Sequence, residues 1–202
     1  MKAKTEAKRL AILRAAAEVF RDVGFERASM TEIRARVGGS KATLYNYFPS
    51  KERLFFEVMY QTKEAELEAI VGSLNSDAAD IKAELLRFGS EFLRFLYSPD
   101  AIAIRRLAIA ESRTSEVGEM SFERYVAPTE HQVAAFMKRA MKRGVLRTAD
   151  PRFLAIHLLS LLESEHLQRL LYNVATTPKP GAISASVRRS IDAFLDGYGQ
   201  RC

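Results

Sequence analysis

The sequence predicts an all-α protein that consists of a small helix-turn-helix head and a larger helical body. Apolar residues recur at helical spacing along the chain, and no alternating run bounded by turn residues indicates a strand. In the head, the pair Gly38 and Gly39 separates two short segments that each carry one apolar face. Glycine permits the positive φ that a sharp connection between two helices requires.

The composition indicates a folded protein in the cytoplasm. Of the 202 residues, 48% are hydrophobic, which is enough to bury a core. No run of about 18 apolar residues could span a bilayer, and the charged N-terminus leads into an amphipathic segment with glutamates, so neither membrane nor secretory targeting is indicated. Cys202 is the only cysteine, which excludes an internal disulfide and a multi-cysteine metal site. We expect no metal and no cofactor.

Capping residues define the first two helices of the head. The first helix carries an apolar stripe that includes Leu13 and ends near Gly24. Ser29 and Glu32 then fit a capping box, in which the serine hydroxyl bonds forward and the glutamate reaches back. The second helix should therefore cover residues 30–37.

The third helix, which follows Ser40 as its N-cap, presents a polar surface. Leu44 and Phe48 lie four residues apart and form its buried face. Lys41, in the first turn, can reach a guanine or a phosphate. The residues that point away from the buried face, and are free to meet a DNA groove, are Ala42, Thr43 and Asn46, and the tyrosines that flank this face are Tyr45 and Tyr47.

Lys51 lies at the start of the next helix, where Ser50 is the expected N-cap. A cation in the first turn opposes the helix dipole, and a bound phosphate would remove this conflict. We expect Ser50 and Lys51 to form a phosphate clamp. The alternative is that Lys51 is an ordinary solvated lysine.

The excess positive charge is confined to the head. Residues 1–55 contain 12 Lys and Arg against 6 Asp and Glu, whereas residues 56–202 contain 19 of each, so the net charge of +6 lies on the head. A basic patch confined to one segment is typical of a protein that binds a polyanion such as DNA. The cations Lys2, Lys4, Lys8 and Arg9 extend this patch into an N-terminal arm, or else form a frayed, soluble terminus.

From about Leu10 to Phe55, the chain resembles the DNA-binding domain of TetR-type transcriptional repressors. The residues that carry the resemblance are Gly24, Phe25, Ser29, Ile33, Gly38, Ser40, Leu44, Tyr45, Tyr47, Phe48, Lys51, Leu54 and Phe55. Two positions depart from the family pattern, which has a small residue in place of Arg34 and an apolar one in place of Gly39.

The resemblance implies a DNA-binding domain, residues 1–50, on a ligand-binding and dimerisation domain, residues 51–202. It further implies a homodimer that binds a palindromic operator and is released by a small lipophilic molecule. By family position, the residues near bases are Thr31, Lys41 and Ala42, and those near the phosphate backbone are Ser40, Thr43, Tyr45, Asn46, Tyr47 and Lys51.

Breaks in the periodic pattern divide the body into helices. The expected ranges are 50–74, 77–97, 99–113, 128–143, 150–176 and one from Ser184 or Ser186 to about residue 198, with joints marked by Gly118 and Pro128. Because the helix that begins at Ser50 connects the head to the body, we expect any signal from the body to pass through it.

The last two long helices carry more apolar surface than two helices can bury alone, which favours a homodimer with two-fold symmetry. The residues expected at its interface are Leu158, Leu162, Ile191, Phe194, Leu195 and Tyr198. Such symmetry would place two reading helices about 34 to 36 Å apart, or a multiple of that distance. The alternative is that these residues only fill the core of one chain.

Aromatic and polar residues of the body could line a mostly apolar ligand pocket. The candidates are Phe88, Phe92, Arg106, Phe122, Tyr125, His131 and His157, and the alternative for each aromatic residue is core packing. No catalytic residues are expected, because metal-ligand, phosphate-loop and nucleophile motifs are absent. A partner-binding helical protein, or an enzyme acting on a small lipophilic compound, are the alternative functions.

Overall fold

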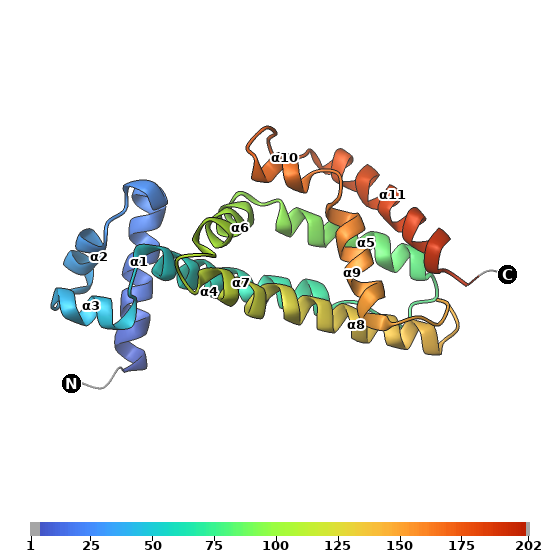
Figure 1. The fold of residues 1–202 in the computed structure, drawn as a ribbon, viewed down its shortest axis with the longest axis horizontal. Helices are drawn as coiled ribbons and strands as arrows, with labels where there is room; N and C mark the ends of the chain where they lie inside the picture. The colour runs from blue at the N-terminus through green and yellow to red at the C-terminus, as the bar shows by residue number, and fades with distance from the viewer. Residues whose placement is uncertain (1–4, 201–202) are drawn as a thin grey trace. The chain divides into compact units, whose positions relative to one another are not determined.

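The computed structural model describes residues 5–200, without the side chain of Thr62, and confirms the all-α prediction (Figure 1). In sequence order the helices are α1 (Glu6–Arg27), α2 (Met30–Val37), α3 (Lys41–Tyr47), α4 (Lys51–Gly72), α5 (Ile81–Leu96), α6 (Pro99–Glu111), α7 (Val117–Ser121), the π-helix η1 (Phe122–Val126), α8 (Ala127–Lys142), α9 (Pro151–Glu163), α10 (Leu167–Leu171) and α11 (Pro180–Tyr198). Within these residues, β pairing is limited to one isolated bridge between Leu146 and Gly199. The arm residues Lys2 and Lys4, and Cys202, lie outside the described residues.

The chain forms two compact units. The first contains the residues up to Glu64 together with Leu107–Gly118, and the second contains Ala65–Arg106 together with the residues from Glu119 onward. The unit that holds the head therefore extends beyond residue 50 and includes a segment far along the chain. Both α4 and α6 have residues in each unit, so α4 is not the only covalent path between them.

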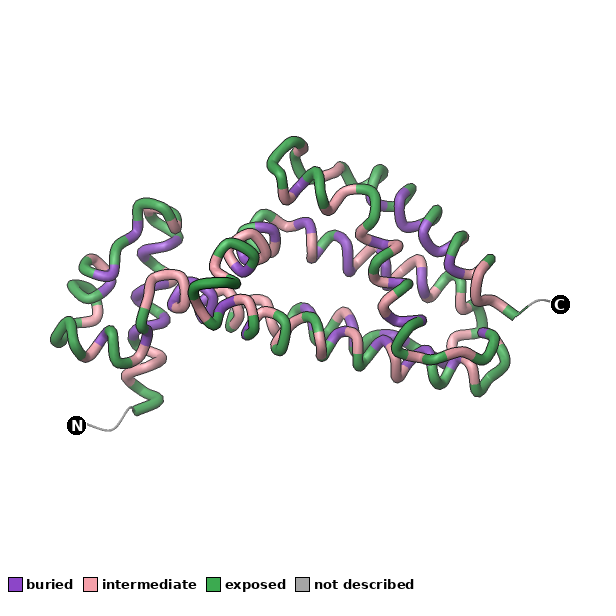
Figure 2. The backbone as a smooth tube through the Cα atoms, in the orientation of Figure 1, coloured by how far each residue is buried: buried purple, intermediate pink, exposed green. Residues whose placement is uncertain are grey.

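In the first unit, α1, α2 and the start of α4 enclose a small apolar core. Its fully buried residues are Ala16, Val19, Ile33, Leu54 and Phe56, with Ile12, Leu13, Leu44 and Phe48 nearly so (Figure 2). Phe55 joins this core to the end of α1, since its ring centroid lies 5.1 Å from that of Phe20 and 4.8 Å from that of Phe25. These contacts fix the support on which α3 is displayed.

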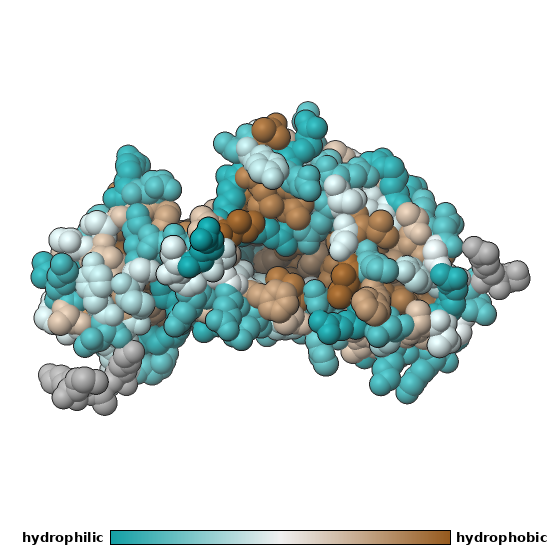
Figure 3. Space-filling model, viewed as in Figure 1, coloured by the Kyte–Doolittle hydropathy of each residue, from teal (hydrophilic) through white to brown (hydrophobic). Residues whose placement is uncertain are grey.

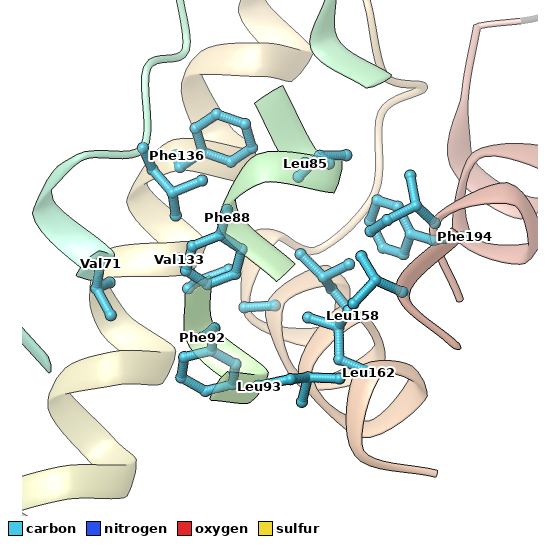
Figure 4. Packing of buried hydrophobic residues seen from close by; sticks show 14 of the residues in the cluster. Val71, Leu85, Phe88, Phe92, Leu93, Val133, Phe136, Leu158, Leu162 and Phe194 are labelled. Atoms are coloured by element: carbon cyan, nitrogen blue, oxygen red, sulfur yellow. The ribbon is translucent and has the colours of Figure 1, made fainter. Parts of the chain in front are cut away.

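The core of the second unit lies among α5, α8, α9 and α11 (Figure 4). Phe88, Phe136 and Phe194 come from three of these helices and are each 0% exposed. Gly89 lets α5 approach its neighbours, because a Cβ there would lie 2.8 Å from side-chain atoms of both Leu162 and Val187. Long-range packing of this kind, rather than local capping, holds the body together.

Three predicted helix limits in the body are wrong. Helix α5 begins after Asp80, whose carboxylate accepts a hydrogen bond from the Ala83 N–H at 3.0 Å, and not near Asp77. The helix expected to reach residue 176 ends at Glu163 and is followed by the separate α10. The last helix begins at Pro180, because a proline is well suited to the first helical position, where its missing N–H has no partner to lose.

The limits of α8 agree with the predicted helix 128–143, but Gly118 and Pro128 do not interrupt the chain, which is helical from Val117 to Lys142. Pro128 has no N–H to donate to the carbonyl of Arg124, and its ring would clash with that carbonyl in an α-helix. The chain instead widens into η1, where the Ala127 N–H donates to the Phe122 carbonyl, five residues back. The proline thus changes the helix type without ending the helix.

Candidate DNA-binding surface

The turn before α3 uses both glycines in the way that the sequence predicts. Gly38 and Gly39 have φ of 71° and 104°, a region that side chains with a Cβ disfavour. Ser40 then caps α3, because its Oγ accepts from the Thr43 N–H at 3.0 Å and lies 2.9 Å from the Thr43 hydroxyl. Arg34, one of the two departures from the family pattern, is exposed on α2.

The cap of α2 is formed in part as predicted. The Ser29 hydroxyl accepts from the Glu32 N–H at 3.1 Å. The Glu32 carboxylate is directed toward the side chain of Arg36, with 3.6 Å between Oε1 and Nη2. Since Ile33 is 0% exposed, one face of α2 is fixed in the core and the opposite face carries Thr31 outward.

Helix α3 holds its apolar residues inward and its polar residues outward. Leu44 is 3% exposed. The candidate DNA-contacting residues that are exposed are Thr31, Ser40, Lys41, Ala42, Tyr45 and Asn46, and those that are half-buried are Thr43, Tyr47 and Lys51. The ammonium of Lys41 lies 5.6 Å from the centre of the Tyr45 ring, within the range of a cation–π interaction. Lys41 and Tyr45 therefore stand side by side on the outer face.

Contacts from α1 hold the turn and α3 in place. The Thr5 N–H donates to the Tyr47 hydroxyl at 2.7 Å, and the Lys8 ammonium donates to the Gly38 carbonyl at 3.2 Å. Sequence reasoning assigned Tyr47 to phosphate and Lys8 to a basic arm. In the structure, both residues also stabilise the fold of the head. The sequence did not indicate this role because their partners, Thr5 and Gly38, are distant in the sequence.

Lys51 has a partner within the head. Its ammonium donates to the Phe25 carbonyl at 2.8 Å and lies 4.3 Å from the centre of the Phe25 ring. Carbonyls at the end of a helix carry partial negative charge, so the end of α1 stabilises this cation. Ser50 is the N-cap as predicted, since its Oγ accepts from the Arg53 N–H at 3.0 Å. A phosphate contact by Lys51 remains a prediction.

A buried carboxylate that sequence reasoning missed joins α1 to α4. Glu57 is 3% exposed, and its side chain lies 2.8 Å from Arg9 Nη2 and 3.5 Å from Arg53 Nε. Arg53 Nη1 also lies 2.5 Å from Glu116, in the segment that follows α6. A buried carboxylate needs such partners, because an unpaired charge in the core is strongly destabilising. The only sequence signal was the pair Arg53 and Glu57 at helical spacing.

The exposed cations of α2 and α3 are available to an external anion. Arg36 is paired with Asp22, with 2.9 Å between Nη1 and Oδ2. Arg34 and Lys41 take part in no ion pair among residues 5–200. An exposed helix with unpaired cations next to it is suited to the phosphates and base edges of a DNA groove.

The candidate ligand residues of the body are brought together in part: Phe88 and Phe92 stack with ring centroids 5.3 Å apart, and Tyr125 packs against the same apolar core. Phe88 and Phe92 are buried in its core, with 0% and 3% exposed, whereas Phe122 is 53% exposed. His131 is exposed on α8, and Tyr125 is half-buried. Apolar residues gather at a hollow in the surface of the body (Figure 3).

Two of the polar candidates have structural partners. The Arg106 guanidinium donates to the carbonyls of Leu170 and Leu171, the latter at 3.1 Å, and so satisfies the end of α10. His157 is exposed, and its Nδ1 lies 2.5 Å from the Tyr198 hydroxyl on α11. These hydrogen bonds join neighbouring helices of the body.

A polar cluster that the sequence did not indicate lies where α5, α6 and α9 meet. Arg105 Nη1 lies 2.5 Å from Glu163 Oε2. Tyr97 is 0% exposed, and burial, with a smaller effect from Glu163, raises the pKa of its hydroxyl well above the usual value. The His166 ring meets the Tyr97 ring edge-on at 6.0 Å.

Burial within the single chain argues against four of the residues predicted at the dimer interface. Leu158, Leu162, Ile191 and Phe194 are each 0% exposed in the single chain, so they fill its own core and have no surface left for a second copy. Leu195 and Tyr198 are half-buried. The surface of the same helices instead presents Phe153, Ile156, His157, Ser160, Ala182, Ala185 and Ala193.

The fold and the exposed α3 define a helix-turn-helix DNA-binding protein with a helical body. The family model for the bacterial regulatory proteins of the tetR family matches residues 12–58, and that for the C-terminal domain of AefR-like transcriptional repressors matches residues 83–200. The chain belongs to the TetR family of transcriptional regulators.

Two solved structures share the architecture of nearly the whole chain, and a sequence relative matches part of it. A TetR-family regulator from Mesorhizobium loti MAFF303099 is 27% identical, with a TM-score of 0.80 over 97% of this chain and 100% of that one. The Flavonoid-responsive Regulator FrrA is 28% identical, with a TM-score of 0.70 over 98% and 100%. The HTH-type regulator YdeS of Bacillus subtilis is 23% identical over 137 residues, which are 68% of this chain and 66% of YdeS.

Among the described residues, no helix is long and apolar enough to cross a membrane.

Proposed function

We propose that the protein is a ligand-responsive repressor that binds a palindromic operator as a homodimer and leaves it when a small lipophilic molecule binds the body. The observation that carries the proposal is the display of α3, whose apolar face is buried and whose polar face is exposed beside unpaired cations. Membership of the TetR family supports it independently.

The proposed DNA contacts divide into two groups. Thr31, Lys41 and Ala42 meet base edges, because they are exposed at the starts of α2 and α3. Phosphates are contacted by Ser40, Thr43, Tyr45, Asn46, Tyr47 and Lys51. Since Lys51 and Tyr47 already have partners in the head, their contribution to DNA affinity should be smaller than that of Lys41.

The proposed dimer uses the outer faces of α9 and α11. Phe153 is 60% exposed, and its ring is 6.4 Å from that of His157, which in turn is 5.8 Å from that of Tyr198. Small residues at Ala182, Ala185 and Ala193 would allow a second copy to approach closely. Exposed aromatic residues next to small ones favour a self-complementary interface.

The proposed effector is a small lipophilic compound with aromatic rings. The body is rich in aromatic residues and has an apolar hollow in its surface (Figure 3). The similarity to FrrA, whose name describes a response to flavonoids, makes flavonoids the first compounds to test. Of the phenylalanines considered for this contact, Phe122 is the one that is not committed to the core, with 53% exposed.

Fluorescence anisotropy with the DNA upstream of its own gene tests the proposal. We expect a palindromic segment to bind more tightly than its scrambled version, and a member of a flavonoid and phenol panel to release it. Light scattering should give the mass of a dimer at micromolar concentration. Equal affinity for palindromic and scrambled DNA would refute the repressor function.

A further inference from the structure

The helix from Val117 to Lys142 carries an apolar pattern that fits two registers. The buried residues of α8 are Thr129, Val133, Phe136, Met137 and Ala140. Residues three, four and seven positions apart share one face of an α-helix. An α-helix continued from this face toward the N-terminus would therefore turn Phe122 and Val126 toward the interior, against which Tyr125 already packs.

The π turn η1 produces a different register. A π turn holds one residue more than an α turn, so the residues before it are rotated by about 100° relative to an α continuation. Before the turn, the buried residues are Val117 and Met120, at 0% and 7% exposed. Phe122 and Val126 are 53% and 36% exposed. Because of the π turn, Val117 and Met120 are buried, whereas Phe122 and Val126 lie at the surface.

Pro128 favours the π register for the reason given above, since it removes the α hydrogen bond to Arg124. A second contact stabilises the turn, because the Thr129 hydroxyl donates to the Tyr125 carbonyl at 2.6 Å. The α register would lose the burial of Val117 and Met120 and bury Phe122 and Val126 instead, so these apolar terms partly cancel. Its main cost is then the clash of Pro128 with the Arg124 carbonyl, about 3 kcal/mol. A ligand that binds the α register more tightly by this amount can shift the equilibrium.

We propose that residues 117–126 form a two-register switch, in which η1 becomes α-helical and Phe122 turns from the surface toward the interior of the body. In this register Phe122 becomes a binding residue for the aromatic effector, and the effector favours the register because it contacts Phe122 only there. The role in effector binding rests on the proposed function. The existence of the two registers does not.

The segment before η1 gives the switch a route to the head. Val117 and Gly118 belong to the same compact unit as α1, α2 and α3. Gly118 is held closely, since a Cβ there would lie 2.9 Å from the Cβ of Ser112, and the neighbouring Glu116 is paired with Arg53 on α4. A rotation of α7 must therefore be transmitted to residues that are fixed to the head.

A single tryptophan tests the switch without DNA or effector. The chain contains no tryptophan, so Phe122→Trp introduces a unique fluorophore at the proposed moving residue. Pro128→Ala restores the N–H that can bond the Arg124 carbonyl and should favour the α register. In the Phe122→Trp/Pro128→Ala protein we expect Trp emission to shift to the blue and to lose most of its quenching by acrylamide, compared with Phe122→Trp alone.

The matched control places the fluorophore at Tyr172, which is 78% exposed in the region after α10. Tyr172→Trp should remain equally quenched with and without Pro128→Ala. A folded Phe122→Trp/Pro128→Ala protein whose Trp stays as accessible as in Phe122→Trp would overturn the proposal. Such a failure would leave the proposed function intact, because neither DNA nor effector is present.

Deletion of one residue in the Pro128→Ala background, where the proline clash is absent, gives a second measurement. Deleting Glu123 in this background removes the extra residue of the π turn and leaves Val117 and Met120 inward, so the protein should keep at least the Tm of Pro128→Ala. Deleting the exposed Lys138 from α8 rotates one end of a regular α-helix relative to the other, and Tm should fall strongly. An equal loss of Tm in both deletion variants would contradict the proposed register relation.

Discussion

The DNA-binding head and the body differ in how well local sequence patterns predict the role of each residue. In the head, the residues proposed to contact DNA lie within α3 and at the starts of α2 and α4, and the caps and turns that form these helices are local, although Tyr47 and Lys51 also bond to distant residues. In the body, residues one turn apart on the same helix differ in exposure. Phe194 is 0% exposed, whereas Tyr198 is half-buried. Local patterns therefore assign roles in the head, and only the packed structure assigns them in the body.

The largest expected effect separates core from surface on the pair α9 and α11. Phe194→Ala should lower the free energy of unfolding by about 3–5 kcal/mol, since it leaves a cavity in a fully packed core. In the dissociated monomer, Phe153→Ala, the control on an exposed aromatic residue, should change it by less than about 0.5 kcal/mol, because association no longer contributes to stability. Urea unfolding measures both.

The same two variants distinguish the core from the proposed dimer interface. Phe153→Ala should weaken the dimer in sedimentation equilibrium, because its ring lies on the proposed contact face. Phe194→Ala should affect the dimer only through its loss of stability. A dimer that is insensitive to Phe153→Ala would argue against this interface.

A smaller effect is expected from the buried carboxylate of the head. Glu57→Gln removes the charge that Arg9 and Arg53 share, and it should lower the free energy of unfolding by about 1–3 kcal/mol, less than for a fully buried pair because both arginines are partly exposed. Glu68→Gln, at an exposed glutamate of α4, is the control. Equal stability of the two variants would show that the pairing contributes nothing.

Alkaline pH should deprotonate Tyr97 only well above the usual pKa of tyrosine. Burial raises the pKa of its hydroxyl in the folded state, so its contribution to stability is fully present below the ordinary tyrosine pKa of about 10 and is lost as the pH rises further. In Tyr97→Phe, the loss of stability above that pH should be smaller. Tyrosine absorbance and urea unfolding, each measured between neutral and strongly alkaline pH, check this, and identical pH profiles for both proteins would contradict it.

The sequence was sufficient to predict the all-α fold and the details of the turn before α3. Gly38, Ser40 and Ser50 act through their own backbone and the next few residues, so local chemistry determines their conformation. The family resemblance then named the candidate contacts. The prediction for Lys51 was incomplete, because its partner, the Phe25 carbonyl, lies 26 residues away.

In the body, the sequence predictions were wrong where one sequence pattern is compatible with two different structures. A leucine stripe on a helix is the same whether it faces its own core or a second copy, and Leu158 and Leu162 proved to face the core. Pro128 was interpreted as a helix start, but a helix can also absorb a proline by widening into a π turn. Burial and backbone bonding, which depend on distant residues, decide between such alternatives.

The central claim, that α3 binds DNA through exposed cations, is tested most directly by the salt dependence of operator binding. For Lys41→Gln we expect weaker binding, and a slope of log affinity against log salt that is reduced by about one, because one phosphate or base contact is lost. Lys142→Gln, at an exposed cation of α8 outside the proposed DNA contacts, is the control and should leave the slope unchanged. A Lys41→Gln protein with the wild-type affinity and slope would contradict the account.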